Sequence, residues 1–97
     1  MIIFVDIDNT ICKTTGMDYA NAKPYTERIG KINELFIKGH EIVYWTARGM
    51  GSGKSYFELT RKQLETWGCL YTSLRCDKPV FDIFIDDKNI NAYDYFN

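Results

Sequence analysis

The sequence has few of the residues on which several common site chemistries depend. His40 is the single histidine, which excludes a multi-histidine metal site and leaves one candidate for any histidine-based triad. The three cysteines, Cys12, Cys69 and Cys76, form no CxxC or Cys/His spacing, which argues against a disulfide framework and against a zinc site. We therefore expect these thiols to be core or incidental residues.

Long apolar runs and an excess of charge of one sign are also missing. No apolar run approaches the length that spans a membrane, and no basic segment followed by an apolar stretch opens the sequence, so we expect a cytoplasmic protein without a membrane partner. The 12 Lys+Arg and 13 Asp+Glu residues leave a net charge of -1. Because no broad basic face is expected, nucleic acid is not an expected partner, and any recognition of phosphate must be local.

The composition does supply material for a hydrophobic core. Of the 97 residues, 45% are hydrophobic and 15% aromatic, which is enough for one domain over residues 1–97 and too little chain for a second. We expect this domain to fold alone or as a small homo-oligomer.

Apolar runs and helical periodicity predict the order of the elements. Strands are expected at residues 2–5, 41–46, 69–74 and 80–85. Helices are expected from Pro24 to Gly39 and from Ser55 to Gly68, with Ser55 as N-cap, and residues 11–23 are expected to form a loop. The alternation of strands and helices favours an α/β domain with a mostly parallel sheet.

Polar side chains follow three of the four expected strands. Asp6 and Asp8 come after the first strand, Thr46 ends the second, and Asp86 and Asp87 end the last. Asn9, in the turn after the first strand, tolerates a left-handed conformation. The carboxyl ends of parallel strands share one edge, where ligands bind in open α/β sheets.

The chemistry of these residues favours a metal and phosphate site. Asp6 and Asp86, with Asp87, can supply carboxylate oxygens to Mg²⁺, and Lys78, just before the last strand, could reach the same edge. Thr46 and the backbone N–H groups after it can donate hydrogen bonds to phosphate oxygens.

The residues at the ends of these strands resemble the motifs of a known family. FVDIDNT, the Thr of YWTARG, the isolated Lys78 and the IDD that contains Asp86 and Asp87 resemble the four motifs of haloacid-dehalogenase-superfamily phosphatases, in the family's order, across residues 4–87. The wider sequence around these motifs is most similar to small capless members associated with capsule or surface-polysaccharide biosynthesis. The resemblance implies a Rossmannoid three-layer α/β/α domain without a cap domain.

The resemblance also implies roles for individual residues. Asp6 is expected to attack phosphorus and form an aspartyl-phosphate, and Asp8 to protonate the leaving oxygen and then activate water. Lys78 and Mg²⁺ are expected to neutralise charge on the transferring phosphoryl group. The expected catalytic residues are Asp6, Asp8, Thr46 and Lys78, the substrate-binding residues Asn9, Thr10, Ala47 and Arg48, and the metal ligands Asp6, Asp8, Asp86 and Asp87.

Other readings of the sequence are weaker or stay open. The glycine-rich GMGSGKS stretch suggests a nucleotide-binding loop, but Arg48 stands six residues before Lys54, where that pattern needs glycine. Contact between substrate and Arg48, Gly51 or Lys54 remains open. The expected substrate is a sugar phosphate or similar small phosphorylated metabolite. The alternatives are a nucleotide, a nucleic-acid end, a phosphoprotein, or a non-catalytic domain that binds metal or phosphate.

Overall fold

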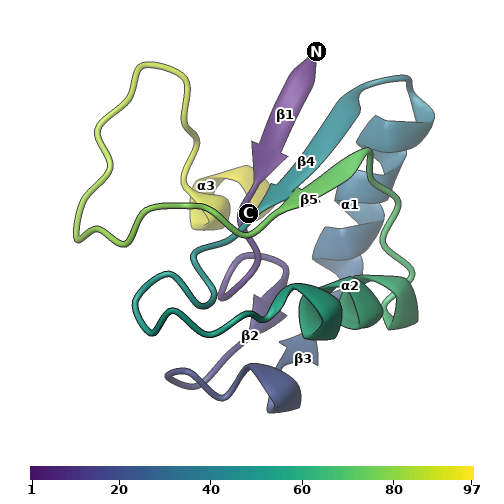
Figure 1. The fold of residues 1–97 in the computed structure, drawn as a ribbon. Coiled ribbons are helices and arrows are strands. Elements are labelled where there is room, and N and C mark those ends of the chain that lie inside the picture. Colours follow the sequence, from purple (N-terminus) through teal and green to yellow (C-terminus); the bar gives the residue numbers. More distant parts are fainter.

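A three-stranded parallel sheet forms the centre of the fold. The computed structural model describes residues 1–97 and places β1 (Ile2–Val5), β4 (Glu41–Trp45) and β5 (Ser73–Arg75) in the order β1-β4-β5 (Figure 1). The α/β class and the parallel sheet that the sequence predicted are confirmed. The third strand is shorter than predicted and begins at Ser73, not at residue 69.

Two helices pack their apolar residues into one core with the sheet. Ile29 and Ile32 of α1 (Thr26–Ile37) and Leu64 of α2 (Phe57–Thr66) belong to a single buried cluster that also contains residues of β1 and β4. The three- and four-residue spacing that predicted these helices gives each one an apolar face to bury. No helix of the structure has the length and apolar character that crossing a membrane requires.

The chain between β1 and α1 is more ordered than predicted. It contains β2 (Cys12–Lys13) and β3 (Lys23–Pro24), which pair antiparallel, and the 3₁₀ turn η1 (Tyr19–Asn21). The prediction of Pro24 in the first helical turn was therefore wrong, since Pro24 lies in β3 and the helix begins at Thr26. A proline can end a short edge strand because it lacks only the N–H donor.

The start of α2 also differs from the prediction. Tyr56 is the N-cap and makes no side-chain capping hydrogen bond, so Ser55 lies one residue too early to cap the helix. The glycine-rich loop before it turns sharply at Gly49, whose φ of 86° places its backbone against the carbonyl group of Lys54. A Cβ atom at Gly49 would collide with that carbonyl, which explains a glycine at this position.

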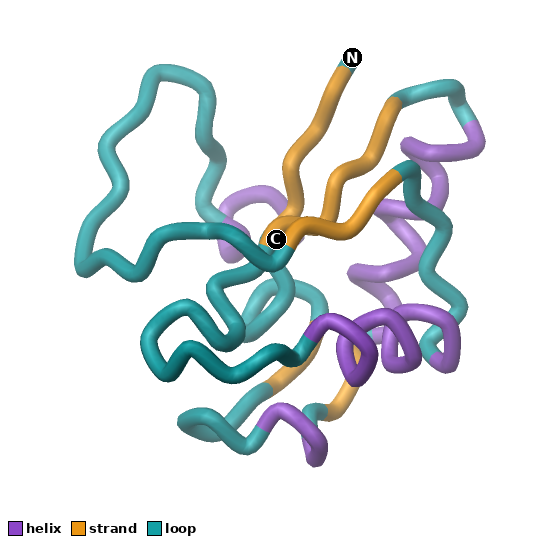
Figure 2. The backbone as a smooth tube through the Cα atoms, in the orientation of Figure 1, coloured by secondary structure: helices purple, strands orange, loops and turns teal.

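The fourth predicted strand, residues 80–85, does not form, and that prediction was wrong. Residues 79–91 have no regular secondary structure and are exposed throughout, and we call them the arm (Figure 2). The arm begins where the Lys78 N–H donates to the Thr46 carbonyl oxygen at 3.1 Å, at the carboxyl edge of the sheet. After the arm, α3 (Ala92–Phe96) returns the chain to the core through Phe96. The segment is apolar enough for a strand, but no neighbouring strand pairs with it.

The core makes a matched pair of leucine substitutions informative. Leu64→Ala should lower the free energy of unfolding by about 2–5 kcal/mol, because it leaves a cavity at a side chain with 0% exposure. Leu70→Ala is the control, since Leu70 is 40% exposed and should cost much less. Urea unfolding followed by circular dichroism measures both, and equal losses would contradict this description of the core.

Candidate functional site

Asp6 lies at the carboxyl end of β1, in a turn that holds its carboxylate. The turn depends on Asn9, whose φ of 61° confirms the predicted left-handed conformation, and on the Thr10 N–H, which donates to the Ile7 carbonyl oxygen at 3.1 Å. The same turn brings the Thr10 hydroxyl to the carboxylate, where it donates to Asp6 Oδ2 at 2.9 Å. Thr10 therefore orients Asp6.

Lys78 approaches the other oxygen of the same carboxylate. Its Nζ lies 3.3 Å from Asp6 Oδ1, although the two residues are 72 positions apart in the sequence. The side chains of Asp6 and Lys78 are 37% and 17% exposed, so the pair is reachable from solvent. The backbone bond from Lys78 to Thr46 anchors the lysine at this edge. The sequence predicted that Lys78 would reach this edge, and that prediction is confirmed.

Asp8 lies in a different environment from Asp6, since its carboxylate pairs with a buried arginine. Arg48 donates from Nη2 to Asp8 Oδ1 at 2.8 Å and from Nε to Asp8 Oδ2 at 3.0 Å. The Thr14 hydroxyl also donates to Oδ1, at 2.5 Å. A bidentate arginine fixes both the position and the plane of a carboxylate. Asp8 is therefore held rigidly and keeps 22% of its side chain exposed.

The guanidinium group of Arg48 is enclosed by residues that the sequence did not single out. Its Nη1 donates to Thr60 Oγ1 at 3.0 Å and to Gln63 Oε1 at 2.6 Å, and the Tyr19 ring lies 4.9 Å from its Cζ atom. Thr60 and Gln63 share the inner side of α2 with Leu64, at helical spacing. Polar residues on the buried face of an amphipathic helix were the signal that could have identified them.

The predicted substrate-binding residues fall into two groups. Ala47 follows β4 and lines a cavity, and Thr10 lies beside Asp6, so both are near the carboxyl edge of the sheet. Asn9 and Arg48 are engaged in structure instead. The Asn9 side chain accepts from the Thr14 N–H at 3.1 Å, and the Arg48 side chain has 0% exposure. The guanidinium of Arg48 therefore contacts Asp8 and not the solvent space from which a substrate would come.

Thr46 is at the predicted edge, but it is almost completely buried. Its exposure is 1%, and its hydroxyl oxygen accepts from the Arg48 N–H at 3.2 Å. The hydroxyl therefore fixes the loop after β4, and its own proton is left for a further acceptor.

The predicted metal ligands are not brought together within one chain. Asp86 and Asp87 lie in the exposed arm, and both oxygens of Asp8 already accept from Arg48. No group of three His, Cys, Asp or Glu side chains lies close enough to hold a metal ion. The prediction that these carboxylates meet at one edge is therefore wrong for the single chain, because it required a strand at residues 80–85.

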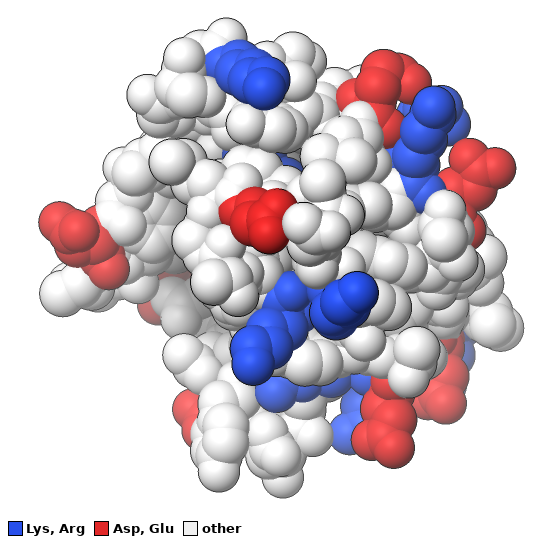
Figure 3. Space-filling view, turned by 90° about the horizontal axis from the view of Figure 1, so that it is seen from below, with Lys and Arg blue, Asp and Glu red and all other residues white.

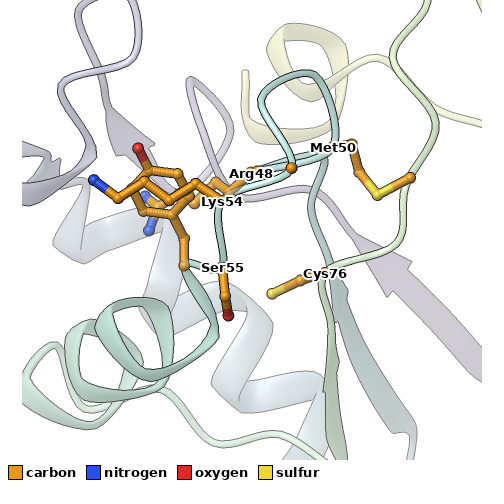
Figure 4. A pocket seen from close by; sticks show the side chains of 8 residues that line it. Arg48, Met50, Lys54, Ser55 and Cys76 are labelled. Carbon is orange, nitrogen blue, oxygen red and sulfur yellow. The ribbon is translucent and has the colours of Figure 1, made fainter.

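The glycine-rich loop after β4 borders two cavities of about 290 Å³ each. The first is lined by Arg48, Lys54, Ser55 and Cys76, among others, and in Figure 4 the Ser55 hydroxyl and the Cys76 sulfur lie near its lower end. The second is lined by residues that include Ala47 and Tyr19. Neither cavity is lined by Asp6 or Asp8, so a substrate would reach the carboxylates from the open edge of the sheet.

Two of the three thiols, Cys12 and Cys69, are buried, and Cys76 is partly exposed. Burial raises the pKa of Cys12 and Cys76 above the usual value and raises the pKa of Cys69 to about 11. A raised pKa keeps a thiol protonated and makes it a poor nucleophile at neutral pH. Core or incidental thiols were predicted for these positions, and Cys12 and Cys69 are buried as core residues.

The surface charge shows no extended patch of one sign on the face seen from below. In Figure 3, basic and acidic side chains are interspersed on that face, and uncharged residues cover most of it. Nucleic-acid binding draws its affinity from many lysine and arginine contacts to phosphates, which this face does not gather. The site offers instead one partly exposed lysine, Lys78, beside a carboxylate.

Comparisons with known proteins support the fold. No family model matches the sequence, and no curated protein matches it. The crystal structure of a structural-genomics target from Vibrio cholerae is similar, with 22% sequence identity, a TM-score of 0.86, and coverage of 98% of this chain and 86% of the other. At this identity the likeness shows a shared fold.

The buried pair predicts an effect of Asp8 on stability. Asp8→Asn should lower the free energy of unfolding by about 3 kcal/mol, because it leaves the enclosed guanidinium of Arg48 without a counter-charge. Asp77→Asn is the control. It breaks the ion pair between Arg75 and Asp77, whose side chains are 49% and 57% exposed, and solvent screens that pair. Thermal and urea unfolding compare the variants, and a loss no larger in Asp8→Asn than in the control would contradict the importance of the buried pair.

Proposed function

We propose that the chain is a phosphomonoester hydrolase that acts through an aspartyl-phosphate at Asp6. The observation that carries the proposal is the approach of Lys78 to Asp6 at the carboxyl edge of the sheet, with Asp8 held two residues away along the chain. The motif resemblance across residues 4–87 assigns the same three residues to this chemistry. The proximity of Lys78 and Asp6 agrees with the roles that the resemblance implies.

Asp6 is suited to the role of nucleophile. Thr10 orients the carboxylate through Oδ2, while Oδ1 lies 3.3 Å from the ammonium group of Lys78. In the attack, Oδ1 or Oδ2 forms a bond to phosphorus as the bond to the leaving oxygen breaks. The positive charge of Lys78 offsets the negative charge of the phosphoryl oxygens and so lowers the repulsion between the two anions.

Asp8 is suited to moving the proton. Oδ1 accepts from Arg48 and Thr14, but Oδ2 accepts only from Arg48 Nε and therefore keeps a lone pair for a substrate proton. In the first step Asp8, when protonated, gives its proton to the leaving oxygen, and in the second it removes a proton from the attacking water. Arg48 is a positioning residue in this scheme, because it touches Asp8 and holds it in place.

The two steps proposed for Asp6 and Asp8 are described without a metal ion. The resemblance implies Mg²⁺, which prefers several oxygen ligands in octahedral geometry. A single chain does not offer that donor set, since Asp86 and Asp87 are in the arm and the oxygens of Asp8 are bonded to Arg48. The residues of one chain therefore do not fit the ion by themselves.

The substrate class is proposed from the motif resemblance. The carboxylates lie at an open edge that neither cavity includes, so the cavity volumes do not limit the size of the substrate. A sugar phosphate or a similar small phosphorylated metabolite is the proposed substrate class, in line with the resemblance to capless phosphatases of polysaccharide biosynthesis.

A second candidate function is a non-catalytic phosphate-binding domain. The observation that favours it is the missing group of three metal-binding side chains within one chain. The two candidates differ in turnover, since a binding domain should bind inorganic phosphate without hydrolysing any phosphoester.

Replacing the nucleophile tests the proposed function directly. With p-nitrophenyl phosphate and a panel of sugar phosphates, assayed with and without Mg²⁺, Asp6→Asn should lower kcat at least about 1,000-fold, because the amide cannot form the acyl phosphate. Asp94→Asn is the control, since Asp94 lies in α3 on the surface. Absence of turnover by the wild type on the whole panel would contradict the proposal.

Lys78 provides a separate test of charge neutralisation. Lys78→Gln should lower kcat/KM by about 100- to 1,000-fold, because it removes the positive charge beside Asp6. Lys62→Gln, at an exposed position of α2, removes the same charge away from the site and should leave the activity near that of the wild type. Equal activities of the two variants would remove Lys78 from the mechanism.

A further inference from the structure

The arm carries a concentration of exposed apolar side chains. Ile83 and Ile85 are 79% and 92% exposed, and Val80, Phe81 and Phe84 are exposed with them. Figure 1 shows the arm as a long yellow-green loop that leaves the body beside β1 and returns to α3. Large apolar patches on a protein surface mark interaction sites, so the arm is a candidate for contact with another surface.

β1 is an edge strand that lacks the usual protection of an edge. It lies at one end of the order β1-β4-β5 and consists of Ile2, Ile3, Phe4 and Val5 alone, with Ile2 66% and Phe4 47% exposed. Free edges of sheets are normally short or blocked by charge or proline. The opposite edge follows this rule, since β5 has three residues and includes Arg75. The edge of β1 therefore has the features of a strand that pairs with another segment.

The arm and the edge of β1 complement each other in type and length. Residues 80–85 are β-branched or aromatic apart from Asp82, which favours pairing with an apolar strand. Parallel pairing that places Ile85 beside Val5 also places Asp86 beside Asp6. The pairing therefore brings the two carboxylates of the arm to the candidate active site.

The arm of one chain cannot make this pairing with its own β1. With Ile85 beside Val5, Val80 would lie about 17 Å back along the strand, at the amino edge of the sheet. The Lys78 backbone is fixed at the carboxyl edge by its bond to Thr46, and the two residues from Lys78 to Val80 reach at most about 7 Å. The arm of a second copy has no such tether to this β1.

We propose that two copies of this chain exchange arms, so that residues 80–85 of each pair in parallel with β1 of the other and Asp86 and Asp87 complete the partner's active site. The inference rests on the proposed function for the role of the site, and on the arm and the edge strand for the interface. It accounts for the missing metal group within one chain, because the predicted carboxylate set is divided between two chains.

The surface available is in the range that a stable dimer needs. The large apolar side chains exposed on β1 and the arm are Ile2, Phe4, Val80, Phe81, Ile83, Phe84, Ile85 and Ile90, which makes sixteen in two copies. At roughly 60–120 Å² for each side chain, their burial approaches on the order of 1,000–1,900 Å². Specific interfaces bury about 1,200–2,000 Å² in total. A reciprocal exchange uses both surfaces of both copies, as two-fold symmetry requires.

Sedimentation velocity tests the interface without reference to activity. The wild type should sediment as a dimer, and Ile83→Lys and Ile2→Lys should each sediment as a folded monomer, with folding checked by circular dichroism. Ile37→Lys is the matched control, since Ile37 is 73% exposed at the end of α1 and should leave the dimer intact. A monomeric wild type, or a dimer that survives either Ile83→Lys or Ile2→Lys, would overturn the proposal. A dimer that survives Ile2→Lys would be expected if two arms paired with each other instead of with β1.

Complementation tests whether the active site is shared. A mixed dimer of one Asp6→Asn chain and one Asp86→Asn, Asp87→Asn chain, purified through two different tags, contains one complete site if arms are exchanged. Its kcat per dimer with p-nitrophenyl phosphate and Mg²⁺ should be about half that of the wild-type dimer, while each variant alone should be inactive. An inactive mixed dimer would overturn the sharing of the site. A wild type without activity would overturn the proposed function, and sedimentation would still decide the interface.

Discussion

The buried guanidinium group of Arg48 is the constraint on which the site depends. A cation with no exposed surface must be paired and fully hydrogen-bonded, and the chain meets this need with the carboxylate of Asp8, the side chains of Thr60 and Gln63, and the ring of Tyr19. These partners come from the turn after β1, from α2 and from the small insertion before β3. One side chain thus ties the three segments around the reacting edge, and the position of Asp8 follows from the packing of α2.

The two carboxylates after β1 have different partners, and the different roles proposed for them rest on this contrast. Asp6 has a hydroxyl group and a partly exposed lysine ammonium as neighbours, both compatible with an approaching anion. Asp8 has a rigid, planar and permanently charged partner in Arg48. Titratable groups in contrasting environments are a common basis for dividing roles between two acids. The same DxD pattern therefore gives two carboxylates with different partners, on which the proposed division into nucleophile and proton carrier is based.

The sequence predicted those parts of the fold that local pattern determines. Apolar runs identified β1 and β4, and the need of an Asp-Asn turn for a left-handed residue identified Asn9. Lys78 was predicted at the edge from its position just before the expected fourth strand. That strand does not form, and Lys78 reaches the edge because it follows β5 closely. The motif resemblance named the site residues, and the structure brings Asp6, Lys78 and Asp8 to one edge of the sheet.

The predictions that failed depended on contacts that are distant in the sequence. Residues 80–85 have the pattern of a strand, but a strand also needs a neighbour, and the anchoring of Lys78 removes the one within the chain. The enclosure of Arg48 was equally hidden, because its partners Thr60 and Gln63 lie on another element. From the sequence alone, an arginine that directly follows a strand is interpreted as a substrate contact. The position of α2 shows that Arg48 is enclosed instead.

The unprotected edge of β1 can pair with a correct partner strand, but it can also pair with other strands and cause aggregation. A lysine or proline in this strand would guard it against unwanted pairing, but would equally remove the surface that a correct partner needs. Such an edge is protected from aggregation only while another segment covers it. If two copies cover this edge as proposed, the rate at which newly made copies meet sets how long the edge is open to aggregation. A sheet whose edges are covered within one chain would not depend on that rate.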